Sequence, residues 1–214
     1  NVDGNINVFL GIRYGQAPTG DFRFKAAQME SAWRGVYDAT KERHRSWQPR
    51  PEGFFAEYSG RDPASYSFDE DCLYLNIYTP GFDDRDRPVL FWIHGGGFGS
   101  GSGYDYNGTM LAAQGDVVVV TVNYRLWYPG FLDLSDHGDE HKGSASNGIS
   151  DQILALKWVH ENVSDFGGDP GNVTIFGQSA GAISVNCLIA APSADGLYHK
   201  AIAHSGGTAA TPPI

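Results

Sequence analysis

The chain has 214 residues and a formal net charge of -10, and 41% of its residues are hydrophobic. That length suits one domain or part of a larger one, and an aromatic content of 13% excludes a disordered chain. The acidic balance argues against nucleic acid or an anionic membrane as the main partner. No apolar run approaches the roughly 20 residues that span a bilayer.

Apolar runs in the first half of the chain predict strands. The first 70 residues are mixed, with short strand-like pieces such as 6–10, and residues 73–78 then alternate like a strand. Residues 89–93 and 117–122 are continuous apolar runs, as expected for strands that are buried on both faces of a sheet.

The second half predicts helices that alternate with strands. An amphipathic helix is expected to begin near residues 146–147, because apolar residues follow at steps of four and three. These are Ile149, Ile153, Leu156, Val159 and Val163. Residues 173–176 predict a buried strand, 180–191 a small-residue helix and 200–204 a further strand. The alternation predicts an α/β fold, with a parallel sheet covered by helices on both faces.

One motif lies where a predicted strand meets a predicted helix. Gly177-Gln178-Ser179-Ala180-Gly181 matches G-x-S-x-G, the nucleophile elbow in which a sharp turn lifts the serine above the sheet edge. The outer glycines are needed because a Cβ there would collide with the neighbouring strand and helix. A bare G-x-S-x-G also occurs by chance in turns, so the predicted strand and helix around it are what favour a nucleophile.

A second glycine motif supports this interpretation. His94-Gly95-Gly96-Gly97-Phe98 follows an apolar run, and such loops supply backbone donors to an oxyanion hole. The alternatives are a flexible loop or a phosphate cradle, but G-x-G-x-x-G spacing fails throughout 95–103 and no Gly-Lys-Ser/Thr follows. We expect the histidine to fix the loop through hydrogen bonds rather than to act as a base.

These motifs resemble the type B carboxylesterase and lipase family, which includes the cholinesterases, and are most similar to its fungal members. The matching segments are FLGIRY at 9–14, GQAPTG at 15–20, RF at 23–24, EDCLYLN at 70–76, HGGGF at 94–98, NYR at 123–125, DQ at 151–152, FGGDP at 166–170, GQSAG at 177–181 and SG at 205–206. The resemblance implies an α/β-hydrolase fold and ester hydrolysis through an acyl-enzyme, without metal or organic cofactor. It makes Ser179 the nucleophile. It places the N–H groups of Gly96, Gly97 and Ala180 in the oxyanion hole.

The resemblance also assigns supporting roles. It implies structural salt bridges from Arg23 to Glu70 and from Arg125 to Asp151. It places Ser205 near the catalytic acid, although a plain turn at the end of a strand explains that serine equally well.

Other groups have both a functional and a structural interpretation. Residues 69–71 (DED) could be a glycosidase carboxylate pair or a metal cluster, but adjacent carboxylates on a strand point to opposite faces, so we favour structure. The polar run 133–141 is expected to be a solvated loop rather than a metal site. Trp127, Tyr128 and the aromatics between residues 54 and 68 could line a gorge for the acyl or alcohol group, or could be core.

Cysteines and sequons bear on the compartment. The family pairs Cys72 with an upstream cysteine, but Ser46 and its neighbours include none, so we expect Cys72 and Cys187 to be free, buried thiols. Asn107 and Asn162 head glycosylation sequons and favour a secreted glycoprotein. The third sequon, at residue 172, begins a strand-like run and is discounted.

A catalytic base and its carboxylate are not apparent after the nucleophile. In this fold the chain order is Ser, then Asp or Glu, then His. Asp195, His199 and His204 follow Ser179, but they lie within the next predicted helix and strand. We therefore expect residues 1–214 to be the N-terminal portion of a single α/β-hydrolase domain. A second, C-terminal polypeptide of the same precursor would complete the sheet and supply Glu and His, giving a heterodimer.

The predicted function is hydrolysis of a carboxylic ester through an acyl-enzyme on Ser179. A catalytically silent binding or adhesion module, of which the family has examples, is the alternative. The retained serine, elbow glycines and glycine loop weigh against it. A separately stable half-domain with its own role is a third possibility.

Overall fold

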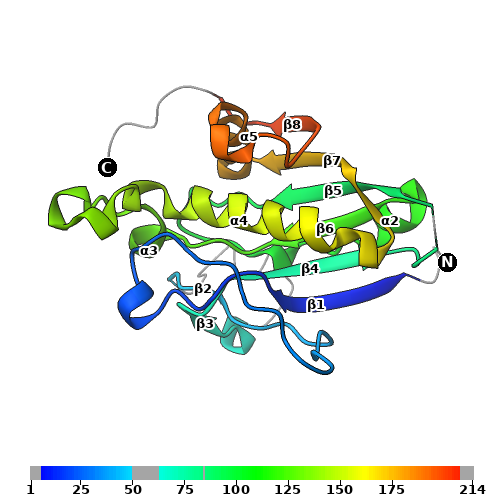
Figure 1. The fold of residues 1–214 in the computed structure, drawn as a ribbon, viewed down its shortest axis with the longest axis horizontal. Helices are drawn as coiled ribbons and strands as arrows, with labels where there is room; N and C mark the ends of the chain where they lie inside the picture. The colour runs from blue at the N-terminus through cyan, green and yellow to red at the C-terminus, as the bar shows by residue number, and fades with distance from the viewer. Residues whose placement is uncertain (1–5, 50–62, 84, 208–214) are drawn as a thin grey trace.

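The computed structural model describes residues 6–49, 63–83 and 85–207, and its centre is a six-stranded sheet of order β1-β4-β6-β5-β7-β8 (Figure 1). The strands are β1 (Asn7–Arg13), β4 (Tyr74–Thr79), β5 (Arg87–Ile93), β6 (Val118–Val122), β7 (Gly168–Gln178) and β8 (Lys200–His204). β6, β5, β7 and β8 run parallel, whereas β4 is antiparallel to both β1 and β6. The short strands β2 (Arg45–Ser46) and β3 (Phe68–Asp69) form a separate parallel pair. The predicted α/β class is confirmed.

Helices cover the two faces of this sheet unequally. One face packs against α4 (Asn147–Asn162) and α5 (Ala180–Ala190) in the larger hydrophobic core, and α3 (Trp127–Phe131) contacts α4. The other face packs against α2 (Thr109–Gly115) in a much smaller core. Short 3-10 turns join these elements at Gly20–Phe22, Pro63–Ser65, Gly103–Asp105, Ser135–His137, Asp139–His141, Ser144–Ser146, Val163–Phe166 and Pro192–Ala194.

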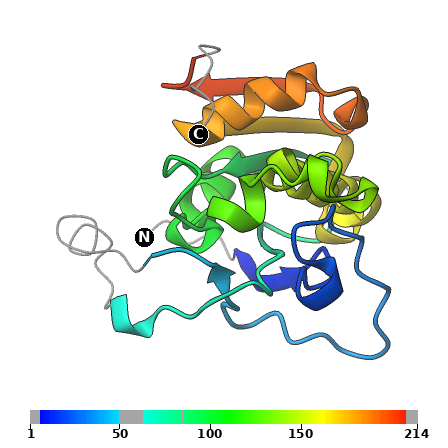
Figure 2. The same ribbon diagram turned by 90° about the vertical axis from the view of Figure 1, so that its left-hand side faces the viewer.

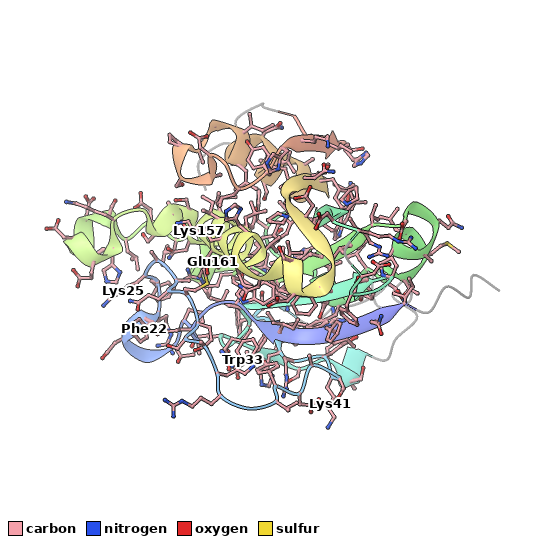
Figure 3. The ribbon with its side chains drawn as sticks, turned by 45° about the vertical axis from the view of Figure 1, so that its right-hand side comes forward. Phe22, Lys25, Trp33, Lys41, Lys157 and Glu161 are labelled. Atoms are coloured by element: carbon pink, nitrogen blue, oxygen red, sulfur yellow. The ribbon has the colours of Figure 1, made fainter. Side chains whose placement is uncertain are left out.

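The sheet has a covered end and an open end. Figure 2 shows the N-terminal segment, in blue, at one end of the sheet and β8, in red, at the other. Outward-pointing charged side chains such as Lys157 and Glu161 mark the solvent face of α4 (Figure 3). Among the described helices, none has both the length and the apolar character needed to cross a bilayer.

The predicted strands and helices are present, and two differ in burial from the pattern of their residues. β4 was expected to alternate, but all six of its residues are buried because both sheet faces are covered at this position. β8 is placed as predicted, yet all five of its residues are exposed. Within the described chain β8 pairs with β7 only, so its other edge is open.

Candidate active site

Ser179 occupies a sharp turn between β7 and α5. Its φ of 57° and ψ of −122° lie in a region that residues with a side chain rarely adopt. The turn is held because Ser179 N–H donates to His204 O at 3.0 Å and Ile183 N–H donates to Ser179 O at 3.0 Å. As the N-cap residue of α5, Ser179 makes no side-chain capping hydrogen bond, so its hydroxyl is not tied to the helix.

The glycines on either side let the strand and helix approach each other. A Cβ on Gly177 would lie 2.5 Å from the backbone of Gly181, and a Cβ on Gly181 would lie 2.1 Å from Ile93 O. Both distances are far below van der Waals contact. The collision expected from the sequence is therefore real, and only glycine fits at either position.

The glycine loop lies directly against this turn. A Cβ on Gly95 would be 3.1 Å from Ser179 Cβ. Gly96 and Gly97 have φ values of 111° and 62°, which turn the loop sharply. Within the described residues, no N–H of Gly96, Gly97 or Ala180 donates to another protein group. The site thus presents unpaired backbone donors from the loop and from the first turn of α5.

His94 supports the loop from beneath. Its Nδ1 lies 2.8 Å from Gly95 O, and because a carbonyl can only accept, Nδ1 carries the hydrogen. The imidazole stacks on Tyr124 at 4.4 Å, and Tyr124 OH donates to His94 O at 2.8 Å. Burial lowers the pKa of His94 to about 4, so the ring is neutral. These contacts match the supporting role expected for this histidine.

Two residues that hold the end of the loop were missed in the sequence. Gln48 donates to Gly101 O and accepts from Gly101 N–H, both at 2.9 Å. Asn123 Oδ1 accepts from Ser102 Oγ at 2.9 Å and from Gly103 N–H at 2.8 Å. The NYR segment at 123–125 includes Asn123, but the sequence assigned no role to this residue. The residues around Gln48 form no recognisable motif.

Charged residues of the matching segments form ion pairs. Arg125 and Asp151 are fully buried, with Arg125 Nη2 2.7 Å from Asp151 Oδ1. Asp151 Oδ2 also accepts from Arg125 N–H at 3.0 Å, so this pair ties the start of α4 to the end of β6. Arg23 and Glu70 make two contacts of 2.6 Å at the surface.

The three neighbouring carboxylates do not share a site. Asp71 faces Arg13 at 2.6 Å, whereas Glu70 faces Arg23. Asp69 Oδ1 accepts from Asp71 N–H at 2.9 Å. This separation matches the structural interpretation of the DED run.

The remaining candidates near the nucleophile do not complete a triad. Ser205, in left-handed conformation with φ 54°, precedes Gly206, where a Cβ would lie 3.0 Å from Ser179 O. His204 contributes its backbone carbonyl, and His199 Nδ1 accepts from Val173 N–H at 3.1 Å. Within the described part of the chain, no imidazole is hydrogen-bonded to Ser179.

Other predictions have mixed outcomes. Cys72 is buried, which raises its pKa to about 12. Cys187 is exposed, so the prediction of two buried thiols was wrong for it. Its side chain lies on the outer face of α5, and this helix is so uniformly apolar that its sequence periodicity does not show which face is outer.

The polar run 133–141 forms exposed 3-10 turns, and Trp127 and Tyr128 are 41% and 59% exposed. Most of the aromatic stretch from residue 54 lies outside the described residues.

The sequon asparagines differ in their surroundings. Asn107 is exposed at the start of the turn before α2, and its Oδ1 accepts from Thr109 N–H at 2.9 Å. Asn162 ends α4, and its Nδ2 donates to Trp158 O at 2.8 Å.

Comparison with known proteins places this geometry in a family. The family model described as carboxylesterase matches residues 1–212. The para-nitrobenzyl esterase of Bacillus subtilis (strain 168) is 44% identical over 208 residues, which are 96% of this chain and 41% of that protein. The liver carboxylesterase of Sus scrofa is 45% identical over 207 residues, 94% of this chain and 36% of that protein.

Solved structures show the same relationship. A carboxylesterase of Geobacillus stearothermophilus matches with a TM-score of 0.84 at 46% identity, and the match covers 93% of this chain and 39% of that protein. A thermophilic PNB esterase has a TM-score of 0.88 at 44% identity, with coverages of 95% and 41%. The particular similarity to fungal members stays a prediction.

The chain therefore spans about two fifths of the length of these relatives. The match nevertheless runs through the glycine loop, the elbow and the sheet that positions them. On that basis the chain belongs to the carboxylesterase family, with its α/β-hydrolase fold.

Proposed function

We propose that the complete protein hydrolyses carboxylic esters through an acyl-enzyme formed on Ser179. The observation that carries this proposal is the Ser179 hydroxyl on a strained turn, beside N–H groups of Gly96, Gly97 and Ala180 that have no partner among the described residues. Strained backbone conformations cluster at active sites, and they persist only where tight packing of the surrounding structure enforces them.

The chemistry follows from these groups. Ser179 Oγ attacks the ester carbonyl carbon while a histidine takes its proton, and the carbonyl oxygen becomes an oxyanion. The N–H groups of Gly96, Gly97 and Ala180 donate to that oxyanion, where preorganised donors stabilise the developing charge. The alcohol leaves with the proton from the histidine, and water then attacks the acyl-enzyme by the same route to release the acid. No step requires a metal or an organic cofactor.

The histidine and its orienting Glu are proposed to come from a separate C-terminal polypeptide of the same precursor. The lack of an imidazole partner for Ser179 among the described residues supports this. The second edge of β8, which pairs with no described strand, supports it too, because exposed parallel strands are rare and bind other chains readily. Ser205 and Gly206, packed at the elbow, would then support the triad from behind.

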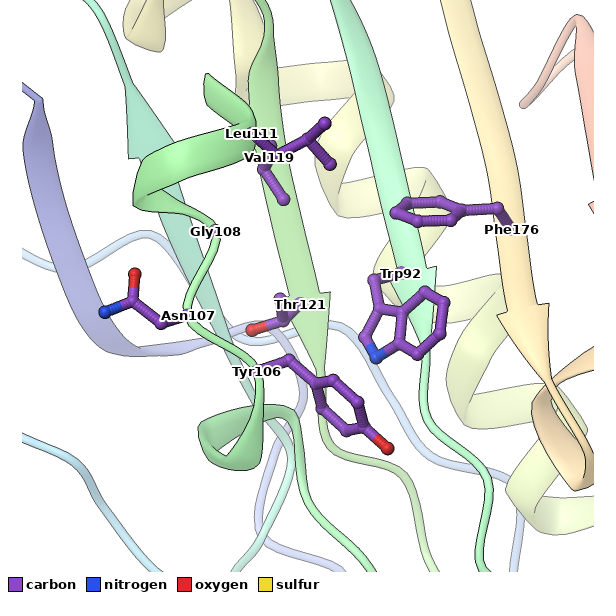
Figure 4. A pocket seen from close by; sticks show the side chains of 8 residues that line it. All are labelled: Trp92, Tyr106, Asn107, Gly108, Leu111, Val119, Thr121 and Phe176. Carbon is purple, nitrogen blue, oxygen red and sulfur yellow. The ribbon is translucent and has the colours of Figure 1, made fainter. Parts of the chain in front are cut away.

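The sheet face that carries α2 also has apolar surface for a partner. Strand register aligns Thr121, Trp92, Phe176 and Ile202 across β6, β5, β7 and β8. Trp92 and Phe176 line a pocket of about 220 Å³, with Tyr106 closing one side (Figure 4). Trp92 Nε1 is buried without a hydrogen-bond partner among the described residues. We assign this apolar pocket to contact with the completing polypeptide.

We also propose that the protein is secreted and glycosylated. Asn107 is an accessible acceptor, whereas a glycan on Asn162 would displace its bond to Trp158 O.

Two measurements on the purified protein test the proposal. Because Ser179→Ala removes the nucleophile, we expect it to lower kcat/KM for p-nitrophenyl acetate by about 10⁴-fold or more. Denaturing electrophoresis is expected to show two polypeptides, one of which carries residues 1–214. Undiminished turnover by the variant contradicts the nucleophile, and a single polypeptide of any mass that is folded and active contradicts the second polypeptide.

A further inference from the structure

Two aromatic residues, one in the glycine loop and one at the start of α3, have strained backbones. Phe98 and Trp127 have φ values of 57° and 52°, in the left-handed region that residues with a Cβ rarely occupy. Such conformations persist only where the surrounding structure enforces them, typically at functional sites. Trp127 N–H donates to Phe98 O at 2.9 Å, so the two strained residues are joined directly.

This conformation places the Trp127 indole on the glycine loop. A Cβ on Gly99 would lie only 3.1 Å from Cε2 and Nε1 of the indole, so the ring covers this glycine closely. Trp127 is nevertheless 41% exposed, and a Cβ on Gly97 would meet nothing within 4 Å. The indole therefore presents a partly exposed, flat apolar surface over Gly99, two residues along the loop from the proposed oxyanion donor Gly97.

Tight packing holds the segments from which the ring projects. The rings of Phe98 and Phe131 lie 4.8 Å apart and couple the loop to the end of α3. A Cβ on Gly130 would lie 2.3 Å from Arg125 O, so α3 is packed tightly against the chain that leaves β6. A preorganised wall of this kind needs no ordering when substrate arrives.

We propose that Trp127 is a specificity-determining residue whose indole forms one wall of the ester site and selects esters with a flat apolar group. This rests on the proposed function of Ser179. In this proposal, an ester whose carbonyl oxygen accepts from Gly96 and Gly97 would extend one of its two substituents along the loop towards Gly99, where the indole lies. An aromatic substituent there buries more apolar area than a methyl or ethyl group and gains contact between rings.

The test is a comparison of kcat/KM values on the complete enzyme. The ratio of kcat/KM for p-nitrophenyl benzoate to that for p-nitrophenyl acetate measures the preference for an aromatic acyl group. The ratio for benzyl acetate to ethyl acetate measures the preference for an aromatic alcohol group. We expect Trp127→Gly to lower one of these two ratios by at least about fivefold, since the apolar wall is lost. Trp127→Asn should do the same, because asparagine also tolerates the left-handed backbone.

Two further variants separate the ring from other effects. Trp127→Phe keeps a ring and should lose less selectivity than Trp127→Gly. Trp33→Ala removes a similarly exposed indole, 45%, from the N-terminal segment (Figure 3) and should leave both ratios unchanged.

Each failure has a distinct meaning. Changes below fivefold in both ratios, for both the Gly and the Asn variant, overturn the inference. An equal loss of rate on all four esters also overturns it, because the ring would then be structural only. A wild-type enzyme that turns over none of the esters contradicts the proposed function itself.

Discussion

At the scale of single residues, the site depends on side chains that are neutral and buried beneath a reactive surface. His94 is the clearest case, because its Nδ1–H holds Gly95 O while Nε2 is buried without a partner among the described residues. The imidazole cannot serve as the base for Ser179 from there. Its role is to keep the first glycine of the loop against the elbow.

The buried imidazole makes stability depend on pH. The pKa of His94 is about 4 in the folded protein, against about 6.5 for an unperturbed histidine. Between these values the unfolded chain binds a proton that the folded chain excludes, so stability falls as pH drops from 6.5 to 4, by about 3 kcal/mol. His94→Asn keeps an N–H for Gly95 O but does not titrate, so urea unfolding should show a shallower pH dependence over this window.

His94→Leu provides the comparison. It also removes the titration, but it leaves Gly95 O without its donor, so it should be less stable than His94→Asn at pH 7. An unchanged pH slope in both variants would show that another group is responsible.

At the scale of elements, the elbow works because β5, β7 and α5 approach more closely than any side chain permits. Gly181→Ala would place a Cβ 2.1 Å from Ile93 O, and neither backbone can move without separating the helix from the sheet. We expect it to lower the free energy of unfolding by about 3 kcal/mol or more.

Gly97→Ala is the matched control. Its Cβ would meet nothing within 4 Å, so only the left-handed φ of 62° is penalised, by about 1 kcal/mol. Both values come from denaturant unfolding of the complete protein. Equal losses would mean that the close approach at Gly181 does not stabilise the elbow.

Elements were also where the sequence was most informative. Continuous apolar runs predicted the buried strands, and G-x-S-x-G and HGGGF located the elbow and the loop, because steric need restricts those positions to glycine. Long-range polar contacts were not predictable. Gln48 reaches Gly101 from 53 residues away, and nothing in its neighbourhood indicates that partner. The exposure of Cys187 and of β8 depends on which surfaces are covered, which local pattern does not encode.

At the scale of the whole molecule, this chain supplies part of the active site that we propose. The proposed nucleophile and backbone donors lie at the carboxyl ends of β5 and β7, where ligands bind in α/β sheets. Among the described residues β8 pairs with β7 only, and the sheet face at Trp92 carries an apolar pocket. Both features agree with our proposal that a further polypeptide supplies the general base.

The most direct measurement is the reaction of the purified protein with a fluorophosphonate, followed by mass spectrometry of its peptides. The probe modifies a serine only when a base activates the hydroxyl, so it reads out the completed site rather than the turn alone. We expect a single adduct, on Ser179, that disappears in Ser179→Ala. A folded, intact protein that gains no adduct, or gains it at another residue, would contradict an activated Ser179 and would favour a silent binding module.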